Sequence, residues 1–276
     1  MPFYPEPSRG LSVNAMVKAL RHFGASRHNQ RKSPFFVVEG YRVCREALMR
    51  QPSWFSFCLL SEPFAASGEG EEIRGLLARL GYSWGVLSQG EFSGLALTEG
   101  SQGVMVAMER PVFPAPRQLS PVCTLILDQV REPGNVGTLL RTAWAAGLGQ
   151  VWFTAGSADP WNPKVIRSGM GAQFALETHL FPDLPTAAEA FRALGGKEIW
   201  CAMMEAPTTL FSPEFSPAGA ALVLGNEGNG ITCPQAGRPV TIPMPGHAES
   251  LNVAQAGTLL LFEALRRLPF ASPTAP

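Results

Sequence analysis

The sequence of 276 residues lacks the signatures of several common classes of protein. No apolar run approaches the ~18 residues that a membrane-spanning helix needs, so we expect a soluble protein with no membrane partner. Its five cysteines form no Cys-x-x-Cys pair, and its four histidines lie far apart with no ligand spacing. No metal site is therefore predicted, and reduced thiols indicate an intracellular, cytoplasmic protein, although the Arg-rich, acid-poor N-terminus leaves a transit peptide open.

Three catalytic fingerprints are also missing. There is no Gly-x-Gly-x-x-Gly, no Gly-Lys-Ser/Thr and no Gly-x-Ser-x-Gly, which counts against a dinucleotide-binding oxidoreductase, a phosphate-loop enzyme and an α/β hydrolase. Charged residues are few, at 16%, and hydrophobic residues make up 46%. This composition excludes global disorder and predicts a chain that buries a sizeable core.

Charge is balanced overall but not along the chain. The 22 basic and 22 acidic residues cancel, yet residues 1–50 hold nine Lys or Arg against three acidic residues. A basic end on a neutral protein suggests a polyanionic partner that one part of the molecule meets; a solvated charged face is the alternative.

Proline divides the chain into two domains. Four prolines fall within residues 111–121, a density that excludes a helix or a central strand and favours a stiff linker. We therefore predict a first domain at residues 1–110, a Pro-rich linker at 111–121 and a second domain at 122–276.

The first domain has the pattern of a small α/β module. The expected helices are 12–23, 41–49 and 71–80, with a basic loop after the first of them. The expected strands are 35–38 and 54–60, with short strands near Trp84 and Val104.

The second domain alternates helices with apolar runs that contain no regular polar positions. Strands of this kind are buried on both faces, which predicts a parallel sheet covered by helices. The expected strands are 122–127, 151–154, 174–178, 199–203, 221–224 and 240–242. The expected helices are 135–146, 186–194 and 251–268. The fold class is therefore α/β.

One unusual segment runs from Asp128 to Ala143, where a buried strand gives way to a helix. Open α/β sheets bind ligands at this end of their strands. Asn135 can cap the helix, and Arg141 stands two positions after the apolar Leu139, off the buried stripe. A planar guanidinium there could grip a phosphate, while the alternative is an ordinary cap and a solvated arginine.

Two later segments have the same character. Residues 221–231 run from a strand into a turn with three glycines and one carboxylate, where backbone amides could approach a ligand; a plain glycine turn is the alternative. Residues 242–257 begin with an apolar loop that suits an adenine ring. The same segment contains Ser250, which can cap the final helix. His247 near Ser250 invites comparison with a hydrolase, but a capping serine beside a loop histidine is more often structural.

In this order and at these separations, the three segments resemble motifs one, two and three of the SpoU (TrmH) branch of the SPOUT superfamily. These are S-adenosylmethionine-dependent RNA 2′-O-ribose methyltransferases. The matching strings are Asn-x5-Arg at 135–141, Leu-Gly-Asn-Glu-Gly at 224–228, and Ile-Pro-Met with Ser-Leu-Asn-Val within 242–253. The resemblance covers residues 122–268 and implies a parallel sheet with a trefoil knot, an exception to the rule against knots.

The resemblance implies S-adenosylmethionine as the cofactor and RNA as the substrate. Arg141 would clamp the target phosphate and stabilise the developing alkoxide, with a phosphate oxygen or water taking the proton. Asn135 and Glu227 would fix Arg141 and the loops around the hydroxyl, and Ser250 and Asn252 would hold the loops of the knot. The expected cofactor-binding residues are Leu224, Gly225, Asn226, Gly228, Ile242, Met244, Ser250, Leu251 and Asn252.

The first domain is similar to the family's substrate-binding domain, which resembles small RNA-binding ribosomal proteins. Val38-Glu39-Gly40 and Gln102-Gly103-Val104 carry this resemblance. This similarity favours ribosomal RNA over transfer RNA as the substrate. The resemblance to the methyltransferase family as a whole implies a homodimer, since family members are homodimers. The expected RNA-binding residues are Lys18, Arg21, Arg31 and Lys32.

One string departs from the family pattern. The family often has Arg-x-Ser-x-Gly, whereas residues 167–171 place Gly169 at the serine, with Ser168 beside it. This puts a secondary polar contact in doubt, not the cofactor pocket. A non-catalytic RNA-binding or ribosome-assembly protein on the same scaffold is the alternative function, and cofactor binding would separate the two.

Overall fold

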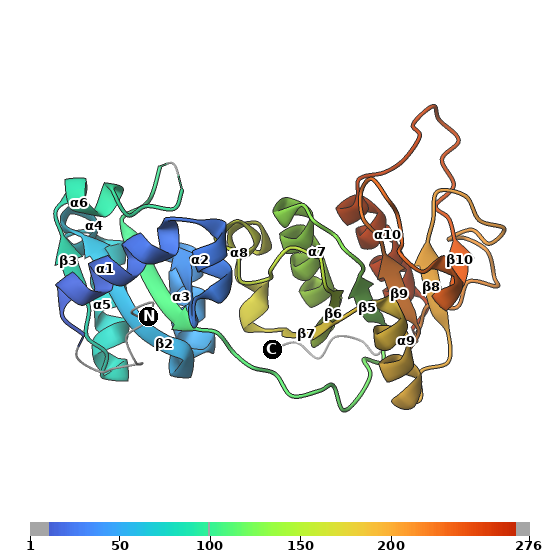
Figure 1. Ribbon diagram of the computed structural model, residues 1–276, viewed down its shortest axis with the longest axis horizontal. Helices are drawn as coiled ribbons and strands as arrows, with labels where there is room; N and C mark the ends of the chain where they lie inside the picture. Colours follow the sequence, from blue (N-terminus) through green and yellow to red (C-terminus); the bar gives the residue numbers. More distant parts are fainter. Residues whose placement is uncertain (1–10, 99, 269–276) are drawn as a thin grey trace. The chain divides into compact units, whose positions relative to one another are not determined.

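The chain forms two units, each built around its own sheet. The computed structural model describes residues 11–98 and 100–268 (Figure 1). The first unit ends at Val112 and also contains Trp161–Phe174, and the second contains Phe113–Pro160 and the chain from Ala175 onward. The boundary between Val112 and Phe113 falls inside the Pro-rich segment 111–121.

The first unit has a mixed four-stranded sheet in the order β1-β4-β2-β3. Strand β4 is antiparallel to both β1 and β2, whereas β3 is parallel to β2. The strands are β1 (Phe35–Glu39), β2 (Phe55–Ser61), β3 (Gly85–Leu87) and β4 (Val104–Glu109).

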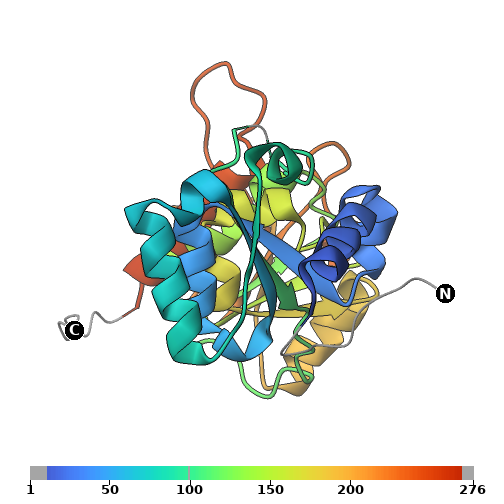
Figure 2. The ribbon, with the colours of Figure 1, turned by 90° about the vertical axis from the view of Figure 1, so that its left-hand side faces the viewer.

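Helices cover both faces of this sheet, as Figure 2 shows for α1 on one side and α3 and α5 on the other. Phe35 and Val37 of β1 pack in one core with Phe23 of α1, since alternate residues of a strand face opposite ways. The helices are α1 (Val13–Gly24), α2 (Arg27–Lys32), α3 (Tyr41–Arg50), α4 (Glu62–Ala65), α5 (Gly68–Leu80) and α6 (Gln89–Ser93), with a 3-10 turn at Pro52–Trp54.

The segment Trp161–Phe174 belongs to this first unit, although the predicted division placed it in the second domain. It contains α8 (Pro163–Gly169) and a 3-10 turn at Ala172–Phe174. The Trp161 ring lies 4.6 Å from the Phe36 ring, and the side-chain amide of Gln51 donates to the Phe174 carbonyl at 2.8 Å. Aromatic packing on β1 therefore places this segment in the first unit. The strand expected at 174–178 begins only at Glu177, because residues 172–174 form the 3-10 turn.

The second unit has a six-stranded sheet in the order β10-β8-β9-β5-β6-β7, and every pair of neighbours is parallel. This confirms the predicted parallel sheet. The strands are β5 (Thr124–Leu127), β6 (Gln150–Thr154), β7 (Glu177–Phe181), β8 (Ile199–Ala202), β9 (Ala221–Leu224) and β10 (Arg238–Val240).

Helices α7 (Pro133–Ala145) and α10 (Val253–Arg266) pack side by side against one face of this sheet, and α9 (Leu184–Ala193) packs with Ile126 and Val223 on the other. A 3-10 turn covers Pro234–Ala236. Gly257 of α10 makes the close packing possible, because a Cβ there would lie 2.3 Å from Leu139 Cδ2 and 2.6 Å from Leu224 Cδ1.

Three local expectations were wrong. Residues 27–32 form helix α2 rather than a loop, because Ser26 caps it and Asn29 donates to the His22 carbonyl at 2.8 Å. Helix α7 begins before Asn135, with Glu132 as its N-cap. Helix α10 is capped by Asn252 instead of Ser250, because Asn252 Oδ1 accepts from the backbone N–H groups of Ala254 and Gln255.

Charged groups fix the C-terminal end of α10 to the connection between β8 and β9. The Arg267 guanidinium donates to the carbonyls of Leu210, Ser212 and Phe215, and to Glu263 at 2.6 Å. Glu263 is 9% exposed and also accepts two hydrogen bonds from Arg266. The hydrogen bond from Arg266, assisted by Arg267, lowers the pKa of Glu263 to about 2 despite the opposing effect of burial.

Candidate functional site

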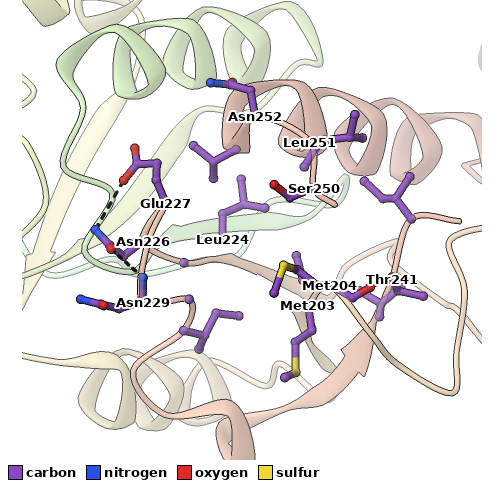
Figure 3. A pocket seen from close by; sticks show the side chains of 18 of the residues that line it. Met203, Met204, Leu224, Asn226, Glu227, Asn229, Thr241, Ser250, Leu251 and Asn252 are labelled. Carbon is purple, nitrogen blue, oxygen red and sulfur yellow. Dashed lines mark hydrogen bonds between the residues drawn. The ribbon is translucent and has the colours of Figure 1, made fainter. Parts of the chain in front are cut away.

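A cavity of about 560 Å³ opens in the second unit where the carboxyl ends of β8 and β9 meet the segment that leads into α10 (Figure 3). The structure brings all nine residues expected to bind the cofactor to the wall of this cavity. They are Leu224, Gly225, Asn226, Gly228, Ile242, Met244, Ser250, Leu251 and Asn252.

The glycine-rich turn after β9 forms one side of the cavity. Asn226 and Gly230 exchange two backbone hydrogen bonds of 2.9 Å, which closes the turn. A Cβ at Gly225 would lie 2.4 Å from the carbonyl carbon of Gly230, so only glycine fits there. The amides of Gly228 and Asn229 donate to Asn226 Oδ1, at 3.0 and 2.9 Å. The turn therefore satisfies these two amides itself instead of offering them to a ligand.

Side chains from the three motifs form one hydrogen-bonded chain beside the cavity. Asn252 Nδ2 donates to Asn135 Oδ1 at 2.9 Å, and Asn135 Nδ2 donates to Glu227 Oε1 at 2.9 Å. Glu227 also accepts from the backbone N–H groups of Arg131 and Glu132, at 3.4 and 3.3 Å. The chain fixes the starts of α7 and α10 and the glycine-rich turn relative to one another.

Glu227 is held in its ionised form by these donors. Burial acts to raise the pKa of its carboxyl, but the side-chain hydrogen bond from Asn135 and the backbone hydrogen bonds outweigh it. The net pKa is lower than that of an ordinary glutamate. Glu227 is therefore an acceptor that organises loops at neutral pH, and a proton donor only in acid.

Arg141 lies on the exposed side of α7, two residues after the buried Leu139. Over residues 11–98 and 100–268, no hydrogen bond or ion pair involves its side chain. The structure thus joins Asn135 to Glu227, but in the described residues neither of them forms a hydrogen bond with Arg141, which they were expected to fix.

Sequence reasoning missed a buried carboxylate behind the site. Asp128 is fully buried, and it accepts from Thr154 Oγ1 at 2.7 Å and from the backbone N–H of Thr232 at 2.6 Å. It ties together the ends of β5 and β6 and the loop after β9. Its position directly after a buried strand was the available signal.

Two methionines that the sequence did not single out also line the cavity. Met203 and Met204 follow β8 and face the cavity across from Ser250 and Leu251 (Figure 3). The two residues are 39% and 71% exposed, respectively. Thioethers are polarisable and adaptable, and so suit the wall of a site for a flat aromatic ring.

The four basic residues expected to bind RNA lie in the first unit, on its two N-terminal helices. Lys18 and Arg21 are on α1, Arg31 and Lys32 are on α2, and all four are exposed. The two helices contact one another, so the four residues lie on neighbouring elements of the first unit.

In residues 11–98 and 100–268, no three His, Cys, Asp or Glu side chains lie together as metal ligands. None of the helices there is long and apolar enough to cross a bilayer.

Comparison with known proteins agrees with this geometry. The model of the SpoU rRNA Methylase family matches residues 123–262. An uncharacterized tRNA/rRNA methyltransferase of Synechocystis is 30% identical, covering 98% of this chain and 99% of that protein. A 23S rRNA (guanosine(2553)-2′-O)-methyltransferase of Bacillus subtilis is 30% identical, covering 84% of this chain and 88% of that protein.

A solved structure extends the similarity to both units. The AdoMet-bound rRNA methyltransferase of Sinorhizobium meliloti has a TM-score of 0.75 and 26% identity, over 94% of this chain and 97% of that one. The family model spans half of the chain and contains all three motifs. The chain therefore belongs to the SpoU rRNA methylase family.

Proposed function

We propose that this protein transfers the methyl group of S-adenosylmethionine to a ribose 2′-hydroxyl of ribosomal RNA. The observation that carries the proposal is the cavity lined by the second and third motifs, which the Asn252–Asn135–Glu227 chain joins to the first motif. The names of the relatives, above all the 23S rRNA 2′-O-methyltransferase of Bacillus subtilis, support ribosomal RNA over transfer RNA.

The cavity fits the cofactor in size and character. Small-molecule sites span ~300–1,000 Å³ and are mostly apolar with a few polar groups, and this cavity is about 560 Å³. Leu224, Ile242, Met244 and Leu251 supply apolar walls, and the missing Cβ of Gly225 lets the backbone turn tightly. When bound, S-adenosylmethionine supplies an activated methyl on a sulfonium. These residues would hold its adenosine and so orient that methyl.

Arg141 is the residue we assign to the reacting ribose. A 2′-hydroxyl must lose its proton as it attacks, and a guanidinium with a pKa above ~12 is a poor base. Arg141 would instead clamp the adjacent phosphate and stabilise the developing alkoxide, with a phosphate oxygen or water as the proton acceptor. It is exposed and has no partner among the described residues, so its donors are available to a ligand.

The first unit would provide the grip on RNA. Lys18, Arg21, Arg31 and Lys32 present four positive charges on α1 and α2, and phosphate neutralisation makes such binding fall steeply with salt. Charge substitution tests this better than deletion of residues 1–110, because the unit also includes Trp161–Phe174.

We also propose the family's trefoil knot and homodimer for this chain. The connection between β8 and β9 pairs with the segment before α10, since Leu210 N–H donates to the Thr241 carbonyl at 2.8 Å. That arrangement supports threading of one through the other. On α10, Leu259 and Phe262 are 45% and 46% exposed, which supports an apolar contact with a second copy. Sedimentation of Phe262→Glu would show a monomer if that contact is real.

The decisive experiment is incubation of the protein with labelled S-adenosylmethionine and unmodified total RNA. We expect label in ribosomal RNA at a linkage that resists alkali, because a 2′-O-methyl blocks attack on the adjacent phosphate. Calorimetry should show binding of S-adenosylmethionine or S-adenosylhomocysteine, and none of NADH. Absence of heat with both sulfur cofactors would contradict the proposal, and binding without transfer would favour the non-catalytic alternative.

A further inference from the structure

The loop between β5 and α7 contains a residue in an unusual backbone conformation. Gln129 has φ +57°, in the left-handed region; in residues 11–98 and 100–268 the only other non-glycine residue with positive φ is Met170. Residues other than glycine adopt this conformation where the surroundings impose it, and such positions cluster at functional sites.

Hydrogen bonds hold the backbone of this loop at each residue from 129 to 132. Gln129 N–H donates to Thr154 Oγ1 at 3.1 Å, and its carbonyl accepts from Asn226 Nδ2 at 3.0 Å. The Val130 carbonyl accepts from Ala158 N–H at 2.8 Å. The N–H groups of residues 131 and 132 donate to Glu227. The loop is therefore rigid although much of it is exposed.

This conformation directs the Gln129 side chain to Arg131. Gln129 Oε1 accepts from an Arg131 guanidinium nitrogen at 2.9 Å, and the rest of that side chain is exposed. No carboxylate forms an ion pair with Arg131 anywhere in residues 11–98 or 100–268. A neutral amide therefore fixes a full positive charge and leaves most of its five donors unused.

The charge lies next to the cofactor cavity. The Arg131 backbone N–H donates to Glu227, which lines the cavity and also accepts from Asn135. An oriented guanidinium without a counter-ion matches a phosphate, which its planar fork can hold through two hydrogen bonds.

We infer that Arg131, oriented by Gln129, is a binding residue for a backbone phosphate of the substrate RNA. The inference rests on the proposed RNA methylation and adds to it a second arginine besides Arg141. Arg131 contacts the substrate, whereas Gln129 is a positioning residue that acts through Arg131. Specificity for a base is not part of this role, because a phosphate contact fixes register without reading sequence.

The test measures RNA binding and methyl transfer by Arg131→Ala as a function of salt. We expect RNA affinity to fall about tenfold, and the slope of log K against log salt to decrease by ~0.7 to 0.9, the change for one lost phosphate contact. Binding of S-adenosylmethionine should be unchanged. Arg117→Ala is the matched control, since it removes the same charge from an exposed residue near the amino ends of the strands, away from the cavity.

Gln129→Asn separates orientation from charge. Asparagine tolerates the left-handed conformation, but it is one methylene too short to keep the hydrogen bond to Arg131. We expect a several-fold rise in KM for RNA with kcat, thermal stability and cofactor binding retained, which a purely structural role would not produce. If wild type methylates RNA and Arg131→Ala keeps its RNA affinity and salt slope, the inference is wrong. If wild type neither binds nor methylates RNA, the proposed function itself fails.

Discussion

Arg141 on α7 and Arg267 at the end of α10 are arginines in opposite surroundings on neighbouring helices. Arg141 is exposed, and no partner holds it in the described part of the chain. The Arg267 side chain is only 19% exposed and donates to Glu263 and to three carbonyls of the β8–β9 connection. The Arg141 guanidinium is open to solvent, whereas the Arg267 guanidinium makes four hydrogen bonds within the fold.

The difference shows how similar chemistry serves two purposes. An arginine that binds substrate must have unsatisfied donors, so its removal should change reactivity more than stability. Removal of an arginine that donates to several groups of the fold should have the reverse effect, because its loss leaves buried acceptors unpaired. Substitutions at each arginine and its neighbours test this contrast.

The largest effect is expected for Arg141→Ala. Methyl transfer should fall on the order of 100- to 1,000-fold, the range for loss of one donor that stabilises a transition state. The free energy of unfolding should change by less than ~0.5 kcal/mol, because no core contact is lost. The measurement is a single-turnover rate at saturating cofactor and RNA.

Arg141→Lys serves as the control for charge. It should rescue the rate only in part, because an ammonium cannot reproduce the bidentate fork. A wild-type rate for Arg141→Ala would show that this arginine is a solvated surface residue and that the contrast with Arg267 has no functional meaning.

Arg267→Ala should give the reverse pattern. It leaves the buried Glu263 with one cationic partner fewer and three carbonyls without their donor, so the free energy of unfolding should drop by about 3 kcal/mol. Equilibrium urea unfolding measures this loss. Arg266→Ala is the matched control and should cost less, because the Arg266 side chain is 68% exposed and has Glu263 as its partner. Equal losses of stability for the two variants would show that the hydrogen bonds from Arg267 to the β8–β9 connection do not stabilise the fold.

The same cluster predicts an acid-sensitive component of stability. The pKa of Glu263 is lowered from 4.5 to about 2 in the folded protein, so its contribution is present above pH 4.5 and is lost as pH falls toward 2. The loss should be on the order of 2 kcal/mol. Unfolding free energies measured between about pH 5 and 3 should fall less steeply for Glu263→Gln than for wild type. Parallel curves would show that Glu263 does not titrate in this range.

A smaller loss of stability than that of Arg267→Ala is expected at the opposite end of α10, for Asn252→Ala. Loss of an N-cap costs about 1 kcal/mol. The variant also removes the hydrogen bond to Asn135, so the rate of methyl transfer should fall by more than the loss of folded protein explains. Asn252→Ser keeps a capping oxygen but cannot reach Asn135 with an amide. If Asn252→Ser restores stability but not the rate of methyl transfer, the hydrogen-bonded chain to Glu227 positions the site. If it restores both, Asn252 acts only as the N-cap of α10.

Much of the fold and of the candidate site could be predicted from the sequence. The apolar run 221–224 coincides with β9 because a strand buried on both faces leaves a continuous hydrophobic pattern. The second and third motifs also indicated which residues line the cavity, and Asn135 of the first motif joins them through hydrogen bonds, because the carboxyl ends of parallel strands share one edge of the sheet. The match to the family model confirms the resemblance from which the cofactor and activity were predicted. Roles of individual residues, the knot and the homodimer stay predictions.

What the sequence could not indicate depends on tertiary contacts. Helix α2 has no apolar residue and therefore no periodicity, and it forms on a cap and on contacts with α1. Ser250 and Asn252 are both good capping residues, and the hydrogen bond of Asn252 to Asn135, 117 positions away, distinguishes them. In the sequence Glu263 and Arg267 look like an ordinary charged pair on a helix, because the carbonyl groups that accept from Arg267 come from a distant loop.

The placement of Trp161–Phe174 in the first unit has a consequence for how the protein can be divided. The chain passes between the two units three times, at 112/113, 160/161 and 174/175. A protease that cuts once within residues 113–121 would therefore leave the first unit built from two polypeptides, with Trp161 and Phe174 still packed on Phe36. A gene split at the same place would encode two fragments that must find each other before either contains a complete first unit.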